Sequence, residues 1–145
     1  MPSVLDLKGM QSTNLPATPA AGAQWTTTLD LNYTYEIICI HFQLVTAVAV
    51  ANRYPAIRIH LAPALDVDLA FIAAITASLT VQVNLWAGIA TPPVYTANYF
   101  SGSLPSPLIL KGGTSITSAV IQLQAADELT DVQILARTWA NPHTA

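Results

Sequence analysis

Two histidines are the strongest candidates for chemistry in this sequence, because imidazole is a common metal ligand. His41 and His60 lie in two extended segments that are separated by a turn. If these segments paired as a simple antiparallel hairpin with Ile40 opposite Leu61, His41 would face His60 with Cβ atoms roughly 5 Å apart. A metal site needs at least a third protein ligand, and no further residue is suitably spaced. We therefore interpret both as ordinary surface or interface histidines and predict no metal.

Two groups of carboxylates are the next candidates for a metal site or for catalysis. Asp66 and Asp68 form one group, and Asp127, Glu128 and Asp131 form the other. Their oxygens suit calcium, but neither spacing matches a calcium-binding loop. A glycosidase would place such a pair in a polar groove, and the sequence shows no sign of one. We interpret both groups as solvated turns.

Motifs for nucleophilic, redox and nucleotide chemistry are missing from the sequence. It contains no G-x-S-x-G, H-E-x-x-H or C-x-x-C pattern. Residues 111–115 (KGGTS) are superficially similar to a phosphate-binding loop but lack its spacing and its helix, so we predict a plain turn. Cys39 is the single cysteine, and we expect a buried, unreactive thiol. We predict no catalytic residue, no cofactor and no enzymatic activity.

The composition restricts the classes of function. Of 145 residues, 52% are apolar and 9% are charged, and the net charge is −3. Such a chain does not attract a phosphate backbone, so we expect no nucleic-acid partner. Residues 1–14 lack the regions of a signal peptide, and the uncharged span 69–110 alternates like strands, so we expect no membrane segment. The low charge indicates that much of the surface meets other protein.

The elements that position these residues are predicted to be strands. Along residues 35–45 the apolar side chains of one parity predict a core face, formed by Ile38, Ile40, Phe42 and Leu44. In the next strand Ile57 and Ile59 share a face, while Arg58 and His60 point away. In all we predict no long helix and eight strands, which cover residues 24–32, 35–45, 57–61, 67–73, 79–85, 104–110, 116–124 and 131–139.

Two segments lie outside the predicted strands. Residues 1–23 are rich in Ala, Pro, Ser and Thr and carry little charge. They predict an extended N-terminal arm, which either lies on a neighbouring subunit or is a frayed terminus. Residues 88–103 predict a long loop with three aromatic residues, Tyr95, Tyr99 and Phe100. Loops of that length in a compact domain are usually functional or disordered.

Three segments of the sequence resemble a class of tailed-bacteriophage virion proteins. YEIICIHFQLVTAVAVANRYPAIRI is similar to that family's strand, small-residue turn ending in Asn-Arg, and next strand. LPSPLILKGGTSI resembles the family's Leu-Pro segment and glycine turn. AADELTDVQILARTW resembles the family's acidic turn and closing strand. The resemblance covers residues 24–139. The alanine-rich residues 62–77 depart from it, since the family has a more polar turn there.

The resemblance implies a fold and a role. The fold is an all-β, eight-stranded jelly-roll-type antiparallel β-sandwich over residues 24–145, with residues 1–23 as the extended arm. A jelly roll places the strands of His41 and His60 in opposite sheets, which would separate the two rings. The implied role is that of a capsid decoration (cement) protein on the exterior of the virion, assembled in the host cytoplasm.

We expect the partners to be the major capsid protein and further copies of this chain, as a homotrimer. The interface candidates are Tyr95, Tyr99, Phe100 and Trp25. Two alternatives stay open. One is a jelly-roll module or head-fibre component that binds host-surface glycan, with Tyr95, Tyr99 and Phe100 as stacking platforms. The other is an enzyme, such as a small cupin-like hydrolase.

Overall fold

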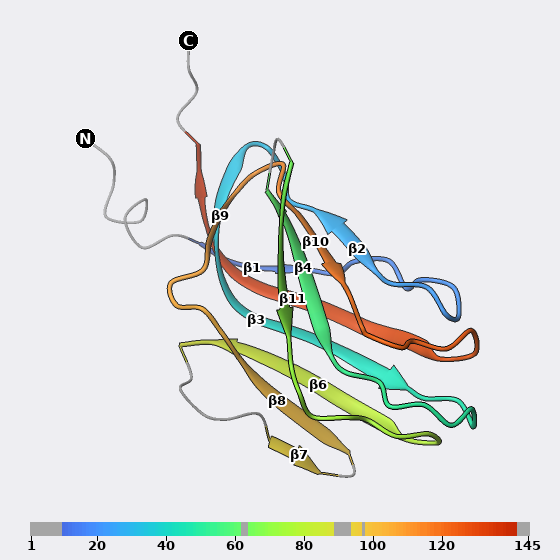
Figure 1. The fold of residues 1–145 in the computed structure, drawn as a ribbon. Coiled ribbons are helices and arrows are strands. Elements are labelled where there is room, and N and C mark those ends of the chain that lie inside the picture. Colours follow the sequence, from blue (N-terminus) through green and yellow to red (C-terminus); the bar gives the residue numbers. More distant parts are fainter. Residues whose placement is uncertain (1–9, 62–63, 89–93, 97, 142–145) are drawn as a thin grey trace.

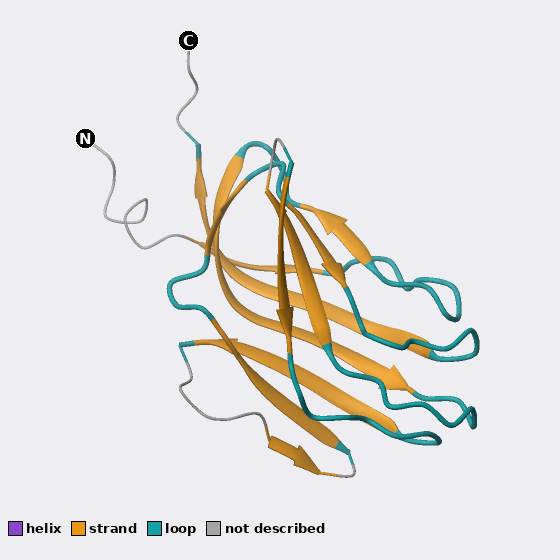
Figure 2. Cartoon of the chain, viewed as in Figure 1, coloured by secondary structure: helices purple, strands orange, loops and turns teal. Residues whose placement is uncertain are grey.

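The described part of the chain consists of strands and loops. The computed structural model describes residues 10–61, 64–88, 94–96 and 98–141. Within these residues no helix is present (Figure 2). The strands form two sheets that face each other as a sandwich (Figure 1). The predicted all-β sandwich is therefore confirmed.

The larger sheet has seven strands. Its order is β1-β11-β3-β6-β8-β7, and β9 also pairs with β3. The strands are β1 (Met10–Asn14), β3 (Tyr33–Val45), β6 (Thr80–Ala87), β7 (Val94–Thr96), β8 (Tyr99–Leu104), β9 (Ile109–Lys111) and β11 (Glu128–Ala140). All neighbours are antiparallel except β6 and β8, which run parallel. The parallel pair arises because the hairpin β7–β8 attaches to the edge of β6 through its second strand.

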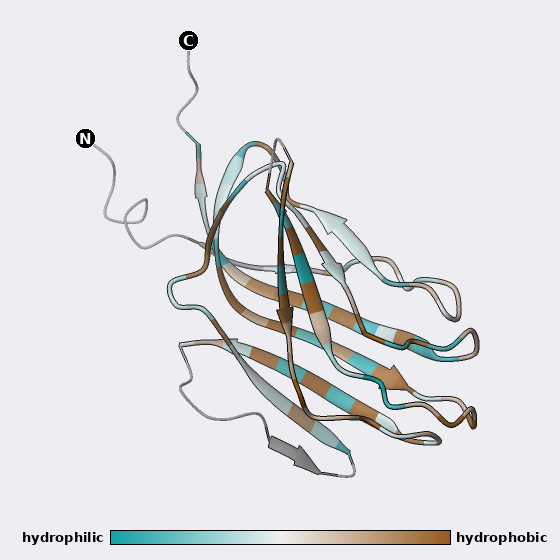
Figure 3. Ribbon diagram, in the orientation of Figure 1, coloured by the Kyte–Doolittle hydropathy of each residue, from teal (hydrophilic) through white to brown (hydrophobic). Residues whose placement is uncertain are grey.

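The smaller sheet has four antiparallel strands in the order β2-β10-β4-β5. They are β2 (Thr26–Thr28), β4 (Ala56–Leu61), β5 (Leu65–Ala70) and β10 (Ser115–Ser118). On β4 the alternation follows the prediction, because Ile57 and Ile59 are buried while Arg58 and His60 are exposed. Figure 3 shows the same alternation of apolar and polar residues along the longer strands of both sheets.

The described part of the chain holds eleven strands, three more than the sequence predicted. One of the three is β1, which pairs with β11 and lies inside the predicted arm. Residues 10–14 are thus part of the sheet rather than of a separate arm. The other two, β7 and β8, begin inside the segment predicted as a loop, and β8 ends one residue beyond it, at Leu104. In β8, Gly102 permits the close approach of Phe71, whose ring carbon would lie 2.6 Å from a Cβ at that position.

The core lies between the two sheets. Ile40, Phe42 and Leu44 are fully buried, as predicted. The prediction for Ile38 is wrong, because Leu135 pairs with Cys39 and Ala136 with Ile37. Because of this shift in register, Ile38 has no partner on β11. The residues of β3 that precede Ile38 therefore point to the opposite faces from those that the sequence predicted. Ile37 is therefore buried in place of Ile38.

Candidate functional site: an uncharged loop end

Four connecting segments meet at one end of the sandwich. They are residues 15–25 before β2, 46–55 between β3 and β4, 71–79 between β5 and β6, and 119–127 between β10 and β11. Figure 1 shows all four at the same end of the two sheets. We refer to this set of residues as the loop end.

Backbone hydrogen bonds fix these loops to one another. Arg53 and Ile75 exchange two of them, with N···O distances of 2.9 and 2.7 Å. Tyr54 and Ile121 exchange another two, of 3.2 and 3.0 Å. Segments 46–55, 71–79 and 119–127 are thereby joined outside the regular strands. The end is built as a defined surface rather than as separate hairpin tips.

A buried ion pair forms the centre of the loop end. Arg53 Nε donates to Asp127 Oδ2 at 2.8 Å, and Arg53 Nη2 donates to Asp127 Oδ1 at 2.9 Å. Neither side chain is exposed to solvent. The remaining nitrogen, Nη1, donates to the carbonyl oxygens of Ala49 and Ala51. The guanidinium group thus organises the alanine-rich turn from inside.

The Asp127 carboxylate is satisfied from several directions. The backbone N–H groups of Ala47 and Gln124 donate to it at 2.7 and 2.8 Å, in addition to the two bonds from Arg53. Burial alone would raise the pKa of Asp127. The hydrogen bonds from Arg53, Ala47 and Gln124 outweigh burial and hold the pKa of this carboxyl below its ordinary value. Asp127 is therefore charged at neutral pH, and its interpretation as part of a solvated turn is wrong.

The surface of the loop end carries no charge. Arg53 and Asp127 are the only charged residues in its four segments, and both are buried. Apolar side chains project from it instead: the exposed fractions of Val48, Val50 and Ile72 are 84%, 99% and 91%. Exposed apolar groups gathered on one surface mark sites of protein contact. Depletion of charge is likewise typical of the core of a protein interface.

Of the aromatic residues predicted for an interface, the structure buries two and exposes one. Trp25 is buried, and its ring packs edge-on against Phe42 at a centroid distance of 5.9 Å. Phe100 is buried against Phe71 at 5.5 Å. Both belong to the core, so their prediction as surface contacts is wrong. Tyr99 is 58% exposed and stays a surface candidate.

Tyr95 belongs to β7, where it pairs with Phe100 in the ladder. Its side chain lies outside the described residues. Because alternate residues of a strand point to opposite faces, the adjacent residues Tyr99 and Phe100 do not form one stacking surface. The aromatic platform predicted for residues 95–100 is not formed by the part that the structure describes.

The two histidines are in different sheets. His41 on β3 has Nδ1 2.8 Å from Asn84 Oδ1 on β6, whereas His60 on β4 contacts Asp66 on β5. The hairpin pairing of the two rings is therefore not formed. Among the described residues, no three His, Cys, Asp or Glu side chains gather as metal ligands would.

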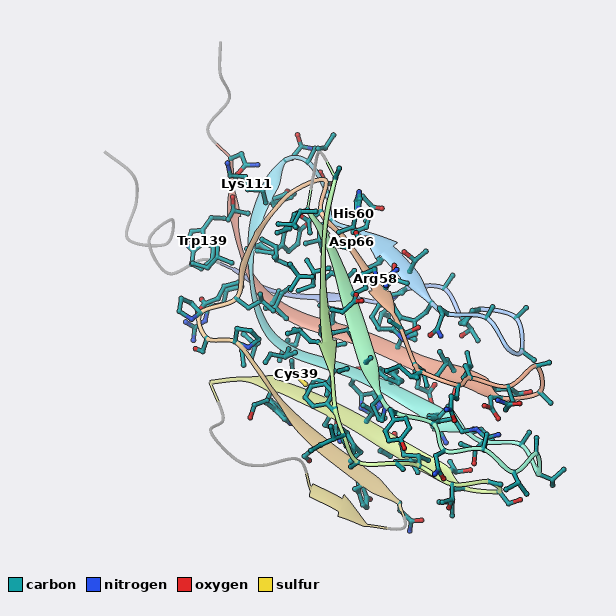
Figure 4. All side chains as sticks on the ribbon, viewed as in Figure 1. Cys39, Arg58, His60, Asp66, Lys111 and Trp139 are labelled. Carbon is teal, nitrogen blue, oxygen red and sulfur yellow. The ribbon has the colours of Figure 1, made fainter. Side chains whose placement is uncertain are left out.

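The first carboxylate group also has a structural explanation. Asp68 receives two hydrogen bonds from Arg58, and Asp66 faces His60, both across the β4–β5 ladder. Figure 4 shows Arg58, His60 and Asp66 together on these strands. The outer face of the smaller sheet is thus a set of paired polar residues. It offers neither an unpaired carboxylate dyad nor an apolar surface.

The glycine-rich segment is the plain turn that the sequence predicted. Gly113 has φ of +87°, a conformation that favours glycine, and its N–H donates to the carbonyl of Leu29 at 2.7 Å. A Cβ on Gly112 would collide with the carbonyl oxygen of Asp30. Backbone packing against residues 29–31 therefore explains both glycines.

Sequence reasoning missed the loop end because its two charges are far apart in the chain. Seventy-four residues separate Arg53 from Asp127. The available signal was Arg53, the single charged residue in the otherwise uncharged stretch AVAVANRYP. A charge in such a stretch is expected to be paired if the stretch is packed against other elements.

Comparisons with known proteins place the chain in no family. No protein-family model matches the sequence, and no curated protein matches it. The described part of the chain contains no apolar helix of membrane-spanning length. The function is therefore argued from the geometry of the loop end and from the resemblance of the sequence segments.

Proposed function

We propose that this chain is a structural virion protein that decorates and stabilises the capsid of a tailed phage. It binds the outer surface of the major capsid protein shell through the loop end. The observation that carries the proposal is the uncharged, apolar surface built around the buried Arg53–Asp127 pair. The resemblance of the sequence segments supplies the capsid as the partner. The protein is assembled in the host cytoplasm and acts without catalysis.

The strand order supports a jelly-roll fold for this protein. With β7, β8 and β9 taken as an insertion, the eight remaining strands pair first with eighth, second with seventh, third with sixth and fourth with fifth. These pairs are β1–β11, β2–β10, β3–β6 and β4–β5. Such nested pairing is what results when one long antiparallel hairpin is rolled into two sheets. Fold alone assigns no function, so the loop end carries the argument.

The loop end is suited to a rigid protein partner. Its loops are held together by backbone bonds and by Arg53, so little conformational freedom is lost on binding. Burying an exposed valine or isoleucine side chain stabilises a contact by about 1.5–3 kcal/mol. Val48, Val50 and Ile72 together contribute roughly 4.5–9 kcal/mol once the shell covers them. Association costs about 4–15 kcal/mol, so the remaining stabilisation comes from the uncharged surface around these residues. The four segments themselves expose no charged group that would have to be desolvated, and the exposed Glu128 borders them at the start of β11.

Self-association completes the proposal. We place a closed homotrimer on the shell, because a cyclic assembly leaves no open end from which subunits polymerise. Tyr99, exposed on β8 beside the short edge strand β7, is the candidate contact with a sister subunit. Light scattering of the purified protein tests the trimer. A strict monomer at micromolar concentration contradicts it.

Co-sedimentation tests the loop end as the docking surface. The probe is the empty shell assembled from the major capsid protein of the phage that carries this chain. We expect Val50→Asp and Ile72→Asp each to weaken binding at least about tenfold, since each places an unpaired charge in an apolar contact. Leu65→Asp is the matched control, because Leu65 is exposed and apolar but lies on β5. Binding of both loop-end variants at wild-type strength would refute the proposal.

The alternative function, a glycan-binding module or head-fibre component, loses its original support. It required Tyr95, Tyr99 and Phe100 to form one stacking platform, and Phe100 is buried in the core. A sugar-binding function for this chain therefore needs a different surface.

A further inference from the structure

A pocket of about 250 Å³ lies on the outer face of the larger sheet, apart from the loop end. Its lining residues come from β6, β3, β11 and β1. It is somewhat smaller than sites for drug-sized ligands, which span about 300–1,000 Å³. The volume suits a ligand of one ring, or the terminal ring of a longer molecule.

Two cross-strand rows with different chemistry form the floor. In the first row Trp86 pairs with Cys39, and Cys39 with Leu135, so these three positions are apolar. Thr13 on β1 pairs with Leu135 and ends the row with a hydroxyl group. In the neighbouring row Asn84 pairs with His41, and His41 with Gln133, so this row is polar. Paired residues lie side by side on one face of a sheet. The pocket thus presents an apolar strip next to a hydrogen-bonding strip.

The polar row presents both a donor and an acceptor. Asn84 Oδ1 lies 2.8 Å from His41 Nδ1. Because an amide oxygen only accepts hydrogen bonds, the Nδ1–H group of His41 is the donor. His41 Nε2 is then an acceptor, and the Asn84 NH₂ group is a donor. Within the described part of the chain neither of these atoms has a hydrogen-bond partner. A hydroxyl group both donates and accepts, and it complements such a pair.

The apolar row includes the indole ring of Trp86. Trp86 is 38% exposed. An indole ring offers a flat apolar surface together with an N–H donor at its edge. It therefore suits a ligand that has an apolar face and polar edges.

The pocket carries no charge and no reactive thiol. None of the described residues that line it is acidic or basic apart from the single imidazole. Cys39, His41 and Asn84 are the residue types of a thiol–imidazole–amide triad. However, burial raises the pKa of Cys39 to about 11, and the hydrogen bond that opposes this comes from the backbone of Leu85 rather than from His41. The thiol stays protonated at neutral pH, so it serves as an apolar part of the floor.

We propose that this pocket binds a neutral saccharide, with the sugar ring stacked on Trp86 and its hydroxyl groups bonded to Asn84 and His41. A pyranose has an apolar face of C–H groups and a rim of hydroxyls, which matches the two rows. An anionic ligand would find no positive charge here, and a flat apolar ligand would leave the polar row unpaired. The partner is therefore a neutral surface glycan, such as the terminal sugar of a cell-surface polysaccharide.

A panel of sugars tests the assignment with the full chain. The probes are glucose, galactose, mannose and N-acetylglucosamine, with N-acetylneuraminic acid as the charged comparison. Saturation-transfer NMR detects binding, and the ¹H–¹⁵N spectrum follows the indole N–H signals of the three tryptophans. We expect at least one neutral sugar to bind and to shift the Trp86 indole signal alone. This wild-type measurement does not depend on the folding of any variant.

Variants then separate this pocket from the rest of the surface. Trp86→Ala and Asn84→Ala should each weaken binding by up to about tenfold, because a stacking contact and a hydrogen bond each contribute up to about 1.4 kcal/mol. Ile109→Ala is the matched control, because Ile109 is an exposed apolar residue on β9 of the same sheet outside the pocket, and this variant should bind as the wild type does.

Three results would overturn the assignment. They are no binding of any neutral sugar at millimolar concentration, preference for the charged sugar, and a shift of a tryptophan other than Trp86. The inference is independent of capsid docking, since Trp86 lies outside the loop end. Trp86→Ala should therefore leave shell binding unchanged, and failure of one proposal leaves the other standing.

Discussion

Removing the buried carboxylate of Asp127 is the sharpest test of how the loop end is held together. In Asp127→Ala the Arg53 guanidinium stays buried without its partner. Breaking a buried ion pair from one side destabilises a protein by about 3–5 kcal/mol. The N–H groups of Ala47 and Gln124 also lose their acceptor, but they are only partly buried and can reach water. We therefore expect the free energy of unfolding to fall by about 3–5 kcal/mol.

Urea denaturation followed by tryptophan fluorescence gives this free energy. The exposed Arg58–Asp68 pair supplies the control, because it has the same chemistry and bidentate geometry at the surface. Asp68→Ala should leave the denaturation midpoint nearly unchanged, since solvent screens exposed pairs. The double variant Arg53→Met, Asp127→Leu should recover most of the loss, because it removes both charges. A loss below about 1 kcal/mol in Asp127→Ala would show that the pair is not structural.

Three further predictions concern the core, the pH dependence and the N-terminal strand. Phe42→Ala should destabilise by about 3–5 kcal/mol in the same urea assay, because its ring is fully buried against Trp25; a loss under about 1 kcal/mol would contradict the core assignment. The pKa of Asp127 is lower in the folded than in the unfolded chain, so its contribution is complete above the unfolded value and is lost as the pH falls through the folded value. The urea midpoint should therefore fall more steeply from pH 5 to pH 2 in the wild type than in Asp127→Asn, and equal slopes would refute this. Deleting residues 1–14 removes β1 and exposes the edge of β11, so we expect a lower melting temperature and more self-association by light scattering; an unchanged melting temperature would mean that β1 does not contribute to stability.

Periodicity was enough to predict the long strands. The alternation at Ile40, Phe42 and Leu44, and at Ile57 and Ile59, follows from burying one face of each strand. It was not enough for β1 or β8, whose sequences MQSTN and YFSGSL are rich in small polar residues. Such strands are defined by the neighbour with which they pair, and a single sequence does not reveal it.

Local irregularities of the strands and long-range pairs were the other features that could not be predicted from the sequence. The bulge opposite Leu135 reverses the parity at Ile38, and nothing in the sequence around Ile38 indicates it. Trp25 and Phe100 were interpreted as interface residues because aromatic side chains suit both cores and interfaces. The loop end depends on Arg53 and Asp127 meeting across the fold, which only the arrangement of the two sheets brings about.

A density map of the virion that carries this chain tests the central claim most directly. The proposed function predicts closed trimers on the outside of the shell, with residues 46–55 and 71–79 in contact with the major capsid protein. It also predicts that Val50 and Ile72 are covered there. Copies held by another surface, with the loop end exposed to solvent, would contradict the account.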